Sequence, residues 1–362
     1  MNSKTKPEKA RKIAFLLSSL KFGGGERVVL NLAAALKETG YDVDILVMSK
    51  EGEFLTEAEI NFSVIDLKCN KTWKLPYQLI IYLVKNRPDG LISSFWKLNI
   101  CSCLARLFVP QVSLIVWEHS QPSLSKNSPV WLYAPSASLM YQLATRVVAV
   151  SNGVSSDIKR ITFGLKNKIS VIFNPIPEPK SIELNTKLNG HSKIIIWVGR
   201  LDEPKNPFLM LDAFATIAKR LDCILWFVGD GPQREPIERR TQLLQLHERV
   251  YFLGFQANPY SYMQRADLLV SSSDREGLGN VIIEGLYCGL PIVSTDSGGV
   301  RDVLLNNVYG EIVPIGEKQA LALAIEHKLA TPKDPLKQKS GAQRFQPQVV
   351  AQQFIAALFQ HS

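Results

Sequence analysis

The stretch from Leu268 to Asp302 decides the fold, and it reads LLVSSSDREGLGNVIIEGLYCGLPIVSTDSGGVRD. Its first residues, Leu268 to Val270, form an apolar run of the length that a buried strand has. Helical spacing of apolar residues begins at the glycine-containing segment 276–280, and a second apolar run follows at residues 291–294. The stretch therefore predicts a strand, a tight loop, a helix and a second strand.

The segment from Gly277 to Asn280 predicts a binding site for an anion. Gly277 and Gly279 have no side chains, so the backbone there can approach a ligand closely. The amides of this segment, which include those of Leu278 and Asn280, then point at the ligand with the positive end of the helix dipole behind them.

Two carboxylates accompany this anion site. Glu276 stands in the loop, and Glu284 follows eight residues later, about two turns along if the helix is continuous. A carboxylate can accept two hydrogen bonds from a vicinal diol, which ribose or a hexose offers. The pair therefore predicts recognition of sugar hydroxyls. The alternative is an ordinary acidic residue near a helix start and a solvated glutamate on the helix.

Two cations follow another predicted strand, at residues 193–199. Arg200 comes directly after this strand and Lys205 five residues later. Both are surface charges on the simplest interpretation. On the alternative interpretation they face the anion site and neutralise the two charges of a diphosphate leaving group.

Together these motifs resemble the nucleotide-sugar signature of a known family. The motifs are Glu-x7-Glu, Gly-x-Gly-Asn, Gly-Leu-Pro, the pair Gly298-Gly299, Gly-Arg-Leu and Lys-Asn. The chain resembles the retaining glycosyltransferases of the two-domain GT-B architecture, family 4, most strongly from residue 193 to residue 302. One departure is Asp302, where members commonly carry Glu.

The resemblance implies a role for each of these residues. Glu284 would bind the ribose diol, and Arg200 and Lys205 the diphosphate. Glu276 and a histidine of the first half, His119, would contact hydroxyls of the donor sugar. The family is thought to use front-face substitution, in which the leaving phosphate helps to deprotonate the acceptor, so we assign no nucleophile. We expect no metal and no cofactor, because no Asp-x-Asp follows a strand and the cations stand beside the diphosphate.

The first half of the chain alternates predicted strands and helices, which indicates a parallel sheet with helices on both faces. Gly23 and Gly24 follow its first strand and open a helix, an arrangement that lets an anion approach. Their spacing does not match the Gly-x-Gly-x-x-Gly fingerprint, which argues against a nicotinamide enzyme. His119 ends the fifth strand, the edge at which ligands of such sheets gather.

Length and composition predict two α/β domains. With 362 residues, the chain is long enough for two cores, and 46% hydrophobic with 21% charged residues fits a globular α/β protein. We expect two Rossmann-like domains facing across a cleft: residues 1–175 on the acceptor side and residues 176–344, which bind the nucleotide sugar. The last segment, at about residues 345–362, contains a predicted helix from Pro347 to Phe359 with an apolar face of Val350, Phe354 and Leu358, and it is expected to cross back to the first domain.

Charge is distributed unevenly between these halves. Residues 1–175 hold 22 Lys and Arg against 13 Asp and Glu, whereas residues 176–362 hold 20 of each. A basic acceptor domain fits a lipid-linked or glycan acceptor on an anionic membrane, with Lys68, Lys71, Lys74 and Trp73 as candidate contacts. Scattered surface charge is the alternative, and no nucleic-acid motif is present. Five cysteines without metal spacing fit reduced thiols. We expect a cytoplasmic protein, peripheral at the inner face of the cell membrane.

The predicted function is transfer of a sugar from a nucleoside-diphosphate sugar with retention of the anomeric configuration. We expect the donor to be UDP-linked and the reaction to serve bacterial envelope polysaccharide or glycoconjugate synthesis. Two alternatives remain. A GT-B epimerase or hydrolase would use the same residues with an added acid/base pair, and a non-catalytic protein would bind the nucleotide sugar without turnover.

Overall fold

The computed structural model describes residues 10–125, 129–179 and 192–360, which form two compact α/β units. Unit 1 comprises residues 1–175 together with 346–362, and unit 2 comprises residues 176–345. The stretch from Pro175 to Ser192, rich in Pro, Lys, Glu, Asn and Ser without periodicity, predicts a linker between the domains, and most of it, residues 180–191, lies outside the described residues.

Unit 1 contains a parallel sheet of seven strands in the order β3-β2-β1-β4-β5-β6-β7. The strands are β1 (Lys12–Leu17), β2 (Asp42–Val47), β3 (Ser63–Asp66), β4 (Gly90–Ser94), β5 (Ser113–Glu118), β6 (Arg146–Ala149) and β7 (Ile169–Val171). Its helices are α1 (Gly24–Glu38), α2 (Leu55–Asn61), α3 (Leu75–Asn86), α4 (Trp96–Arg106), α5 (Val130–Met140), α6 (Asn152–Ile161) and α14 (Pro347–Phe359).

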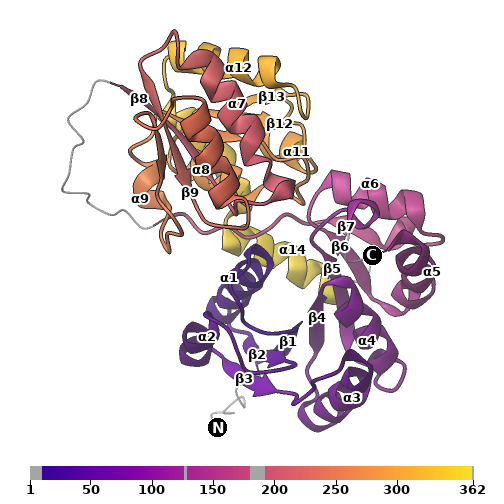
Figure 1. Cartoon of the computed structure of the whole chain (residues 1–362). Coiled ribbons are helices and arrows are strands. Elements are labelled where there is room, and N and C mark those ends of the chain that lie inside the picture. The colour runs from indigo at the N-terminus through magenta and orange to yellow at the C-terminus, as the bar shows by residue number, and fades with distance from the viewer. Residues whose placement is uncertain (1–9, 126–128, 180–191, 361–362) are drawn as a thin grey trace. The chain divides into compact units, whose positions relative to one another are not determined.

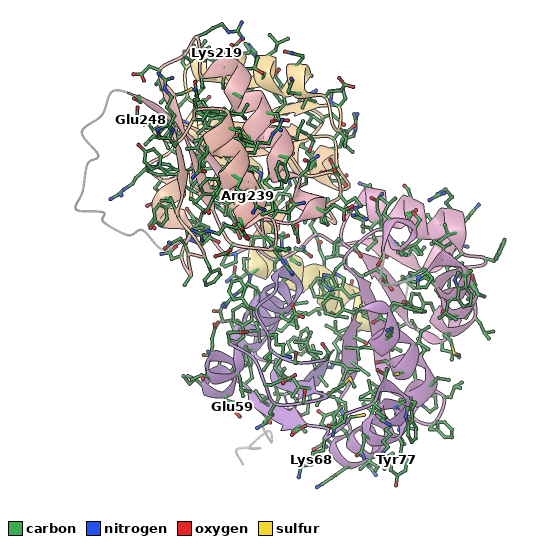
Figure 2. All side chains as sticks on the ribbon, in the orientation of Figure 1. Glu59, Lys68, Tyr77, Lys219, Arg239 and Glu248 are labelled. Carbon is green, nitrogen blue, oxygen red and sulfur yellow. The ribbon has the colours of Figure 1, made fainter. Side chains whose placement is uncertain are left out.

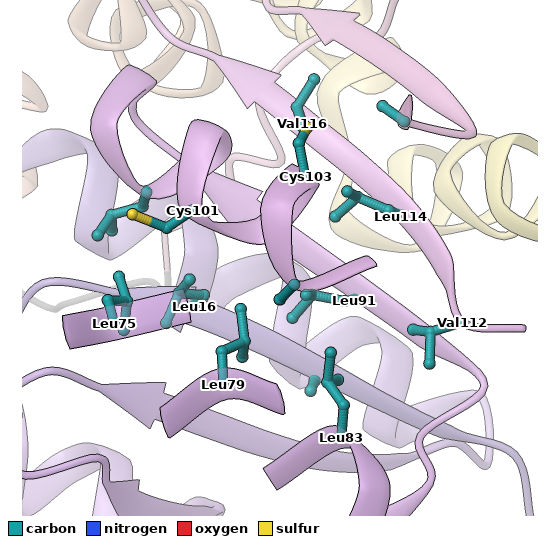
Figure 3. Close-up of a cluster of buried hydrophobic side chains, with 14 of the residues drawn as sticks. Leu16, Leu75, Leu79, Leu83, Leu91, Cys101, Cys103, Val112, Leu114 and Val116 are labelled. Atoms are coloured by element: carbon teal, nitrogen blue, oxygen red, sulfur yellow. The ribbon is translucent and has the colours of Figure 1, made fainter. Parts of the chain in front are cut away.

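Helices cover both faces of this sheet (Figure 1). Successive side chains along a strand point to opposite faces, so each strand contributes to both layers. In β5, Leu114 and Val116 join the core beneath α3, α4 and α5, which Figure 3 shows. The next residue, Trp117, points to the opposite face and packs edge-on against Phe354 of α14, with ring centroids 4.7 Å apart. The sequence predicted that the last helix would return to the first domain, and the packing of α14 on β5 and α1 confirms this.

Unit 2 repeats the design with six parallel strands in the order β10-β9-β8-β11-β12-β13. They are β8 (Lys193–Val198), β9 (Cys223–Val228), β10 (Val250–Phe252), β11 (Leu268–Ser271), β12 (Ile292–Thr295) and β13 (Glu311–Val313). The helices are α7 (Pro207–Ile217), α8 (Arg234–Leu243), α9 (Tyr260–Met263), α10 (Asn280–Tyr287), α11 (Val300–Leu304), α12 (Lys318–Ala330) and α13 (Pro335–Ala342). The stretch that begins at Leu268 is a strand, loop, helix and strand, as predicted.

In both units the chain starts at a central strand, builds outward on one side and then crosses to the other side. The strand pairs β1/β4 and β8/β11 are therefore the topological switch points, where loops at the carboxyl ends diverge and leave room for a ligand. The predicted site residues of unit 2 follow β8 and β11, and the glycines at residues 23–24 follow β1.

Candidate functional site

The centre of the unit 2 site is an ion pair across its switch point. Lys205 ends a short 3-10 helix, η5 (Glu203–Lys205), that follows β8. Its Nζ lies 2.5 Å from Oε1 of Glu276, which follows β11, and the hydroxyl of Ser273 donates to the same oxygen at 2.8 Å. The Glu276 side chain is only 10% exposed and that of Lys205 28%. Two donors thus hold the carboxylate of Glu276 in one position.

Asn206, the next residue, joins the two loops and starts the following helix. Its side-chain oxygen accepts from the backbone N–H of Leu209 and so caps α7. Its amide nitrogen donates to the carboxylate of Asp274 at 3.0 Å. The Lys-Asn pair of the sequence therefore has two separate tasks, because Lys205 contacts the site glutamate while Asn206 fixes the loop geometry.

Glu284 completes the cluster from α10. It is half-buried, and the loss of water around its carboxyl group raises its pKa to about 7, while the charge of Lys205 and a hydrogen bond with Tyr260 act in the opposite direction. Because α10 begins at Asn280, Glu284 lies about one turn from the helix start rather than two turns from Glu276.

Two glycines of the loops around the site have positive φ, and one of them has no room for a side chain. Gly279 has φ +91° and caps α10, and Gly298 has φ +55° after β12. A Cβ at Gly298 would lie 1.7 Å from the carbonyl oxygen of Glu276. Leu278 is buried, which anchors the loop between Gly277 and Asn280. The second glycine pair of the sequence thus allows the two loops to touch.

Arg200 stands apart from this cluster. Its side chain is 71% exposed and its Nε lies 3.5 Å from the carboxylate of Asp202. No hydrogen bond or ion pair joins it to Lys205, Glu276 or Glu284 among the described residues. The structure therefore brings three of the predicted charged residues together and leaves the fourth, Arg200, with an exposed side chain at the margin of the loop.

In unit 1 the predicted glycines lie at the β1/β4 switch point. Gly23 precedes α1 in extended backbone, and Gly24 is the first residue of the helix. A Cβ on the next residue, Gly25, would lie 2.7 Å from the ring of Phe95, which follows β4. Phe95 itself has φ +73°, a conformation that costs a non-glycine residue about 1–3 kcal/mol. Backbone strain of this kind is common at functional sites.

His119 lies beside Phe95 at the end of β5. Its Nε2 is 3.2 Å from the hydroxyl of Ser94, and its ring centroid lies 5.2 Å from that of Phe95 and 4.5 Å from that of Trp117. Burial lowers its pKa to about 3, so the imidazole is neutral near pH 7. Its Nδ1 is buried and has no hydrogen-bond partner within the part of the chain that the structure describes. A neutral imidazole suits an uncharged hydroxyl partner, which Ser94 provides here.

Sequence reasoning missed a buried polar network next to His119. The carboxyl group of Glu118 accepts hydrogen bonds from the hydroxyl of Tyr141 and from the side-chain amide of Asn99. Burial raises its pKa to about 7, against the effect of these two donors. A glutamate directly before a predicted site histidine, in an apolar strand, was the available signal.

No cluster of His, Cys, Asp and Glu in the described ranges is arranged to hold a metal ion. All five cysteines are free thiols, four of them buried.

Comparison with known proteins identifies the family from both halves of the chain. A family model described as glycosyl transferases group 1 matches residues 181–345, and one described as glycosyltransferase family 4 matches residues 22–178. The chain belongs to the group 1 glycosyltransferases. This confirms the resemblance that the motifs between residues 193 and 302 predicted.

Relatives of this glycosyltransferase act in glycan synthesis. It is 28% identical over 333 residues to a Campylobacter jejuni N-acetylgalactosamine-N,N'-diacetylbacillosaminyl-diphospho-undecaprenol 4-alpha-N-acetylgalactosaminyltransferase, covering 86% of this chain and 88% of that one. It is 27% identical to the lipopolysaccharide core biosynthesis glycosyltransferase LpsD of Rhizobium meliloti, covering 84% of each chain.

Solved structures show the same fold. Anabaena HepE in complex with UDP superposes with a TM-score of 0.81 at 22% identity, covering 96% of this glycosyltransferase and 99% of HepE. Two parallel-sheet α/β domains with GT-B neighbours confirm the predicted fold class.

Proposed function

We propose that this glycosyltransferase moves a sugar from a UDP-sugar to a lipid-linked glycan with retention of anomeric configuration. The observation that carries the proposal is the cluster of Lys205, Glu276 and Glu284 at the unit 2 switch point, which sets one cation and two carboxylates beside a glycine loop. This combination suits a ligand that bears both phosphate and hydroxyl groups.

Each residue has a role in the proposal. Lys205 and Arg200 stabilise the charge that develops on the leaving diphosphate, an effect that is usually a large part of catalysis. Glu284 accepts hydrogen bonds from the ribose diol, and Glu276 from the donor sugar. In unit 1, neutral His119 contacts a hydroxyl of the donor sugar, and Gly23 and Gly24 contribute backbone to the donor site at the start of α1.

The relatives support the substrate classes. HepE is named as a complex with UDP, and the Campylobacter jejuni relative is named for a diphospho-undecaprenol acceptor. We infer a UDP-sugar donor, an acceptor of the lipid-diphosphate or lipopolysaccharide type, and a place of action at the cytoplasmic face of the membrane, in bacterial envelope synthesis.

Product analysis tests this proposal. The protein is incubated with a panel of UDP-sugars and a detergent-solubilised, short-chain polyprenyl-diphosphate oligosaccharide, and products are followed by mass spectrometry. We expect acceptor mass to increase by one sugar and NMR to show the donor's anomeric configuration in the new linkage. Conversion of the donor alone would support an epimerase or hydrolase, and donor binding without product over the whole panel would support a non-catalytic protein.

We also propose that the reaction needs no metal, with the cations of Lys205 and Arg200 supplying the positive charge beside the diphosphate. Transfer in the presence of EDTA should remain within about twofold of the untreated rate. Loss of activity that magnesium or manganese restores would contradict this proposal.

A further inference from the structure

Helix α3 of unit 1 carries an apolar stripe on its outer side. Trp73 precedes the helix in η1 (Thr72–Lys74), and Tyr77, Ile81 and Val84 follow at intervals of four, four and three residues. This spacing places them along one side of the helix. They are 72%, 67%, 44% and 56% exposed. We call these four residues, with the flanking Lys74 and Lys85, the α3 surface.

The inner side of α3 is apolar as well. Leu75, Leu79, Tyr82 and Leu83 are buried in the core of unit 1 (Figure 3). An ordinary surface helix turns charged residues outward opposite its buried stripe, whereas α3 presents aromatic and aliphatic side chains there. A contiguous exposed patch of this kind marks a surface for a partner.

The chain segment that contains this stripe is rich in positive charge. Residues 67–156 contain nine Lys and Arg but only two acidic residues, Asp89 and Glu118, whereas residues 1–66 contain nine Lys and Arg and ten acidic residues. Asp89 accepts a hydrogen bond from the backbone of Lys12, and Glu118 is buried. The excess positive charge of the first half therefore begins where α3 does.

The two sides of unit 1 also differ in how their lysines are paired. Around α2, Lys21, Arg27 and Lys50 each form an ion pair with a glutamate. Lys74 and Lys85 have no carboxylate partner among the described residues, and Lys74 Nζ instead lies 5.2 Å from the centre of the Trp73 ring. Figure 2 shows Tyr77 and Lys68 projecting outward from the α3 side, away from Glu59 of α2.

We propose that the α3 surface binds an anionic membrane. Trp and Tyr side chains favour the boundary between headgroups and acyl chains, and lysines reach from there to lipid phosphates. A second copy of this chain fits less well, because a two-fold interface would face Lys74 and Lys85 with their own equivalents and no acidic residue. No helix among the described residues is long and apolar enough to cross a membrane. The proposal rests on the lipid-linked acceptor of the proposed function.

Vesicle flotation with paired variants tests this surface. The whole protein is mixed with phosphatidylcholine vesicles, with or without phosphatidylglycerol. We expect it to float with the anionic vesicles only and to be released by salt. The double variant Trp73→Ser/Tyr77→Ser should lower the bound fraction at least about tenfold, and Lys74→Glu/Lys85→Glu similarly. Ile60→Ser is the matched control, since Ile60 is 78% exposed on α2 in the same unit, and it should float as the wild type does.

Two results would overturn the proposal. One is a Trp73→Ser/Tyr77→Ser variant that floats like the wild type. The other is a light-scattering measurement without lipid in which the wild type is a dimer and the Trp73→Ser/Tyr77→Ser variant is a monomer. The stripe would then be an interface between copies. Transfer to the detergent-solubilised acceptor is measured in the same preparations. Wild type that floats through the α3 surface but transfers no sugar would refute the proposed function alone.

Discussion

The two switch points of the molecule share a topology but differ in their chemistry. At β8/β11 a lysine, two glutamates and a serine hydroxyl meet in a charged cluster. At β1/β4 and the adjoining end of β5, the corresponding region holds a neutral histidine between two aromatic rings, a serine hydroxyl and a strained phenylalanine.

This difference indicates that the shared fold determines where each site lies, whereas the loop residues determine its chemistry. A charged cluster is suited to a ligand whose charge changes during reaction, because fixed charges stabilise developing charge. A neutral imidazole among aromatic rings is suited to uncharged hydroxyl groups. We therefore expect substitutions in unit 2 to have larger effects on the reaction than those in unit 1.

The largest effect is expected for Lys205→Ala. It removes a charge-assisted contact to the leaving group and one of the two donors that hold Glu276, so turnover should fall by at least about 100-fold. Arg200→Ala should have a comparable effect, because it removes the second cation that contacts the diphosphate. Steady-state rates with saturating donor measure both, and Arg239→Ala, on the exposed side of α8, is the control. A variant that keeps half of the wild-type rate would remove that residue from the site.

Glu284→Gln should raise the donor KM about 30-fold, because a carboxylate that accepts from a diol is replaced by a weaker acceptor. The wild-type donor KM should also fall as the pH rises through about 7, since only the ionised carboxylate accepts both hydrogen bonds. The same raised pKa stabilises the folded protein at low pH, and this contribution is lost as the pH rises from about 4.5 to about 7.

The Glu284→Gln variant should therefore lose the pH dependence of the donor KM and part of the pH dependence of the melting temperature. Glu276→Ala, by contrast, should mainly lower kcat. Equal changes of kcat and KM in both variants would show that the two glutamates do not divide these roles.

Gly298→Ala tests the contact between the two loops of unit 2. The added Cβ would meet the Glu276 carbonyl at 1.7 Å, so Glu276 must move and kcat should fall about tenfold. Gly316→Ala is a matched control, since Gly316 also has positive φ, at +77°, but has nothing within 4 Å of the added atom. Backbone strain alone should lower its melting midpoint by about 2–4 °C without loss of kcat. Equal activity of the two variants would mean that the contact does not position Glu276.

The smallest effect is expected in unit 1, for His119→Asn. Loss of one uncharged hydrogen bond should lower kcat/KM about fivefold. The pH dependence between pH 6 and pH 8 should stay as in the wild type, because the imidazole is already neutral there. Rate profiles of both proteins measure this. An acidic limb near pH 6.5 that disappears in the variant would show that His119 ionises during the reaction and that unit 1 resembles unit 2 after all.

The sequence by itself determined the family and most of the element order. Apolar runs of strand length, glycines after them and the spacing between Glu276 and Glu284 are local features, and they identified the strand, loop and helix of the nucleotide-sugar site. Helix α14 was predicted with its bounds and its buried face, Val350, Phe354 and Leu358, because its apolar residues follow helical periodicity.

Sequence periodicity did not predict the elements whose buried residues have no regular spacing. Helix α5 was not predicted because it has no charged residue and contains Pro135, so it shows no polar face. The sequence of residues 331–340 is polar and rich in proline and lysine, which predicts no helix, yet α13 begins there at Pro335, with Asp334 capping its N-terminus. The short edge strands β7 and β13 have only three residues each, too few to show a pattern.

Only the tertiary structure decided which site residues meet. Lys205 and Glu276 are 71 residues apart, and His119 and Ser94 are 25 apart. Their contacts exist because β8 pairs with β11 and β4 with β5, which aligns the carboxyl ends of distant strands at one edge. Burial then sets the charge of each group, since it keeps His119 neutral and raises the pKa of Glu284 to about 7. Composition and spacing carry no information about either effect, because both depend on which groups the folded chain removes from water.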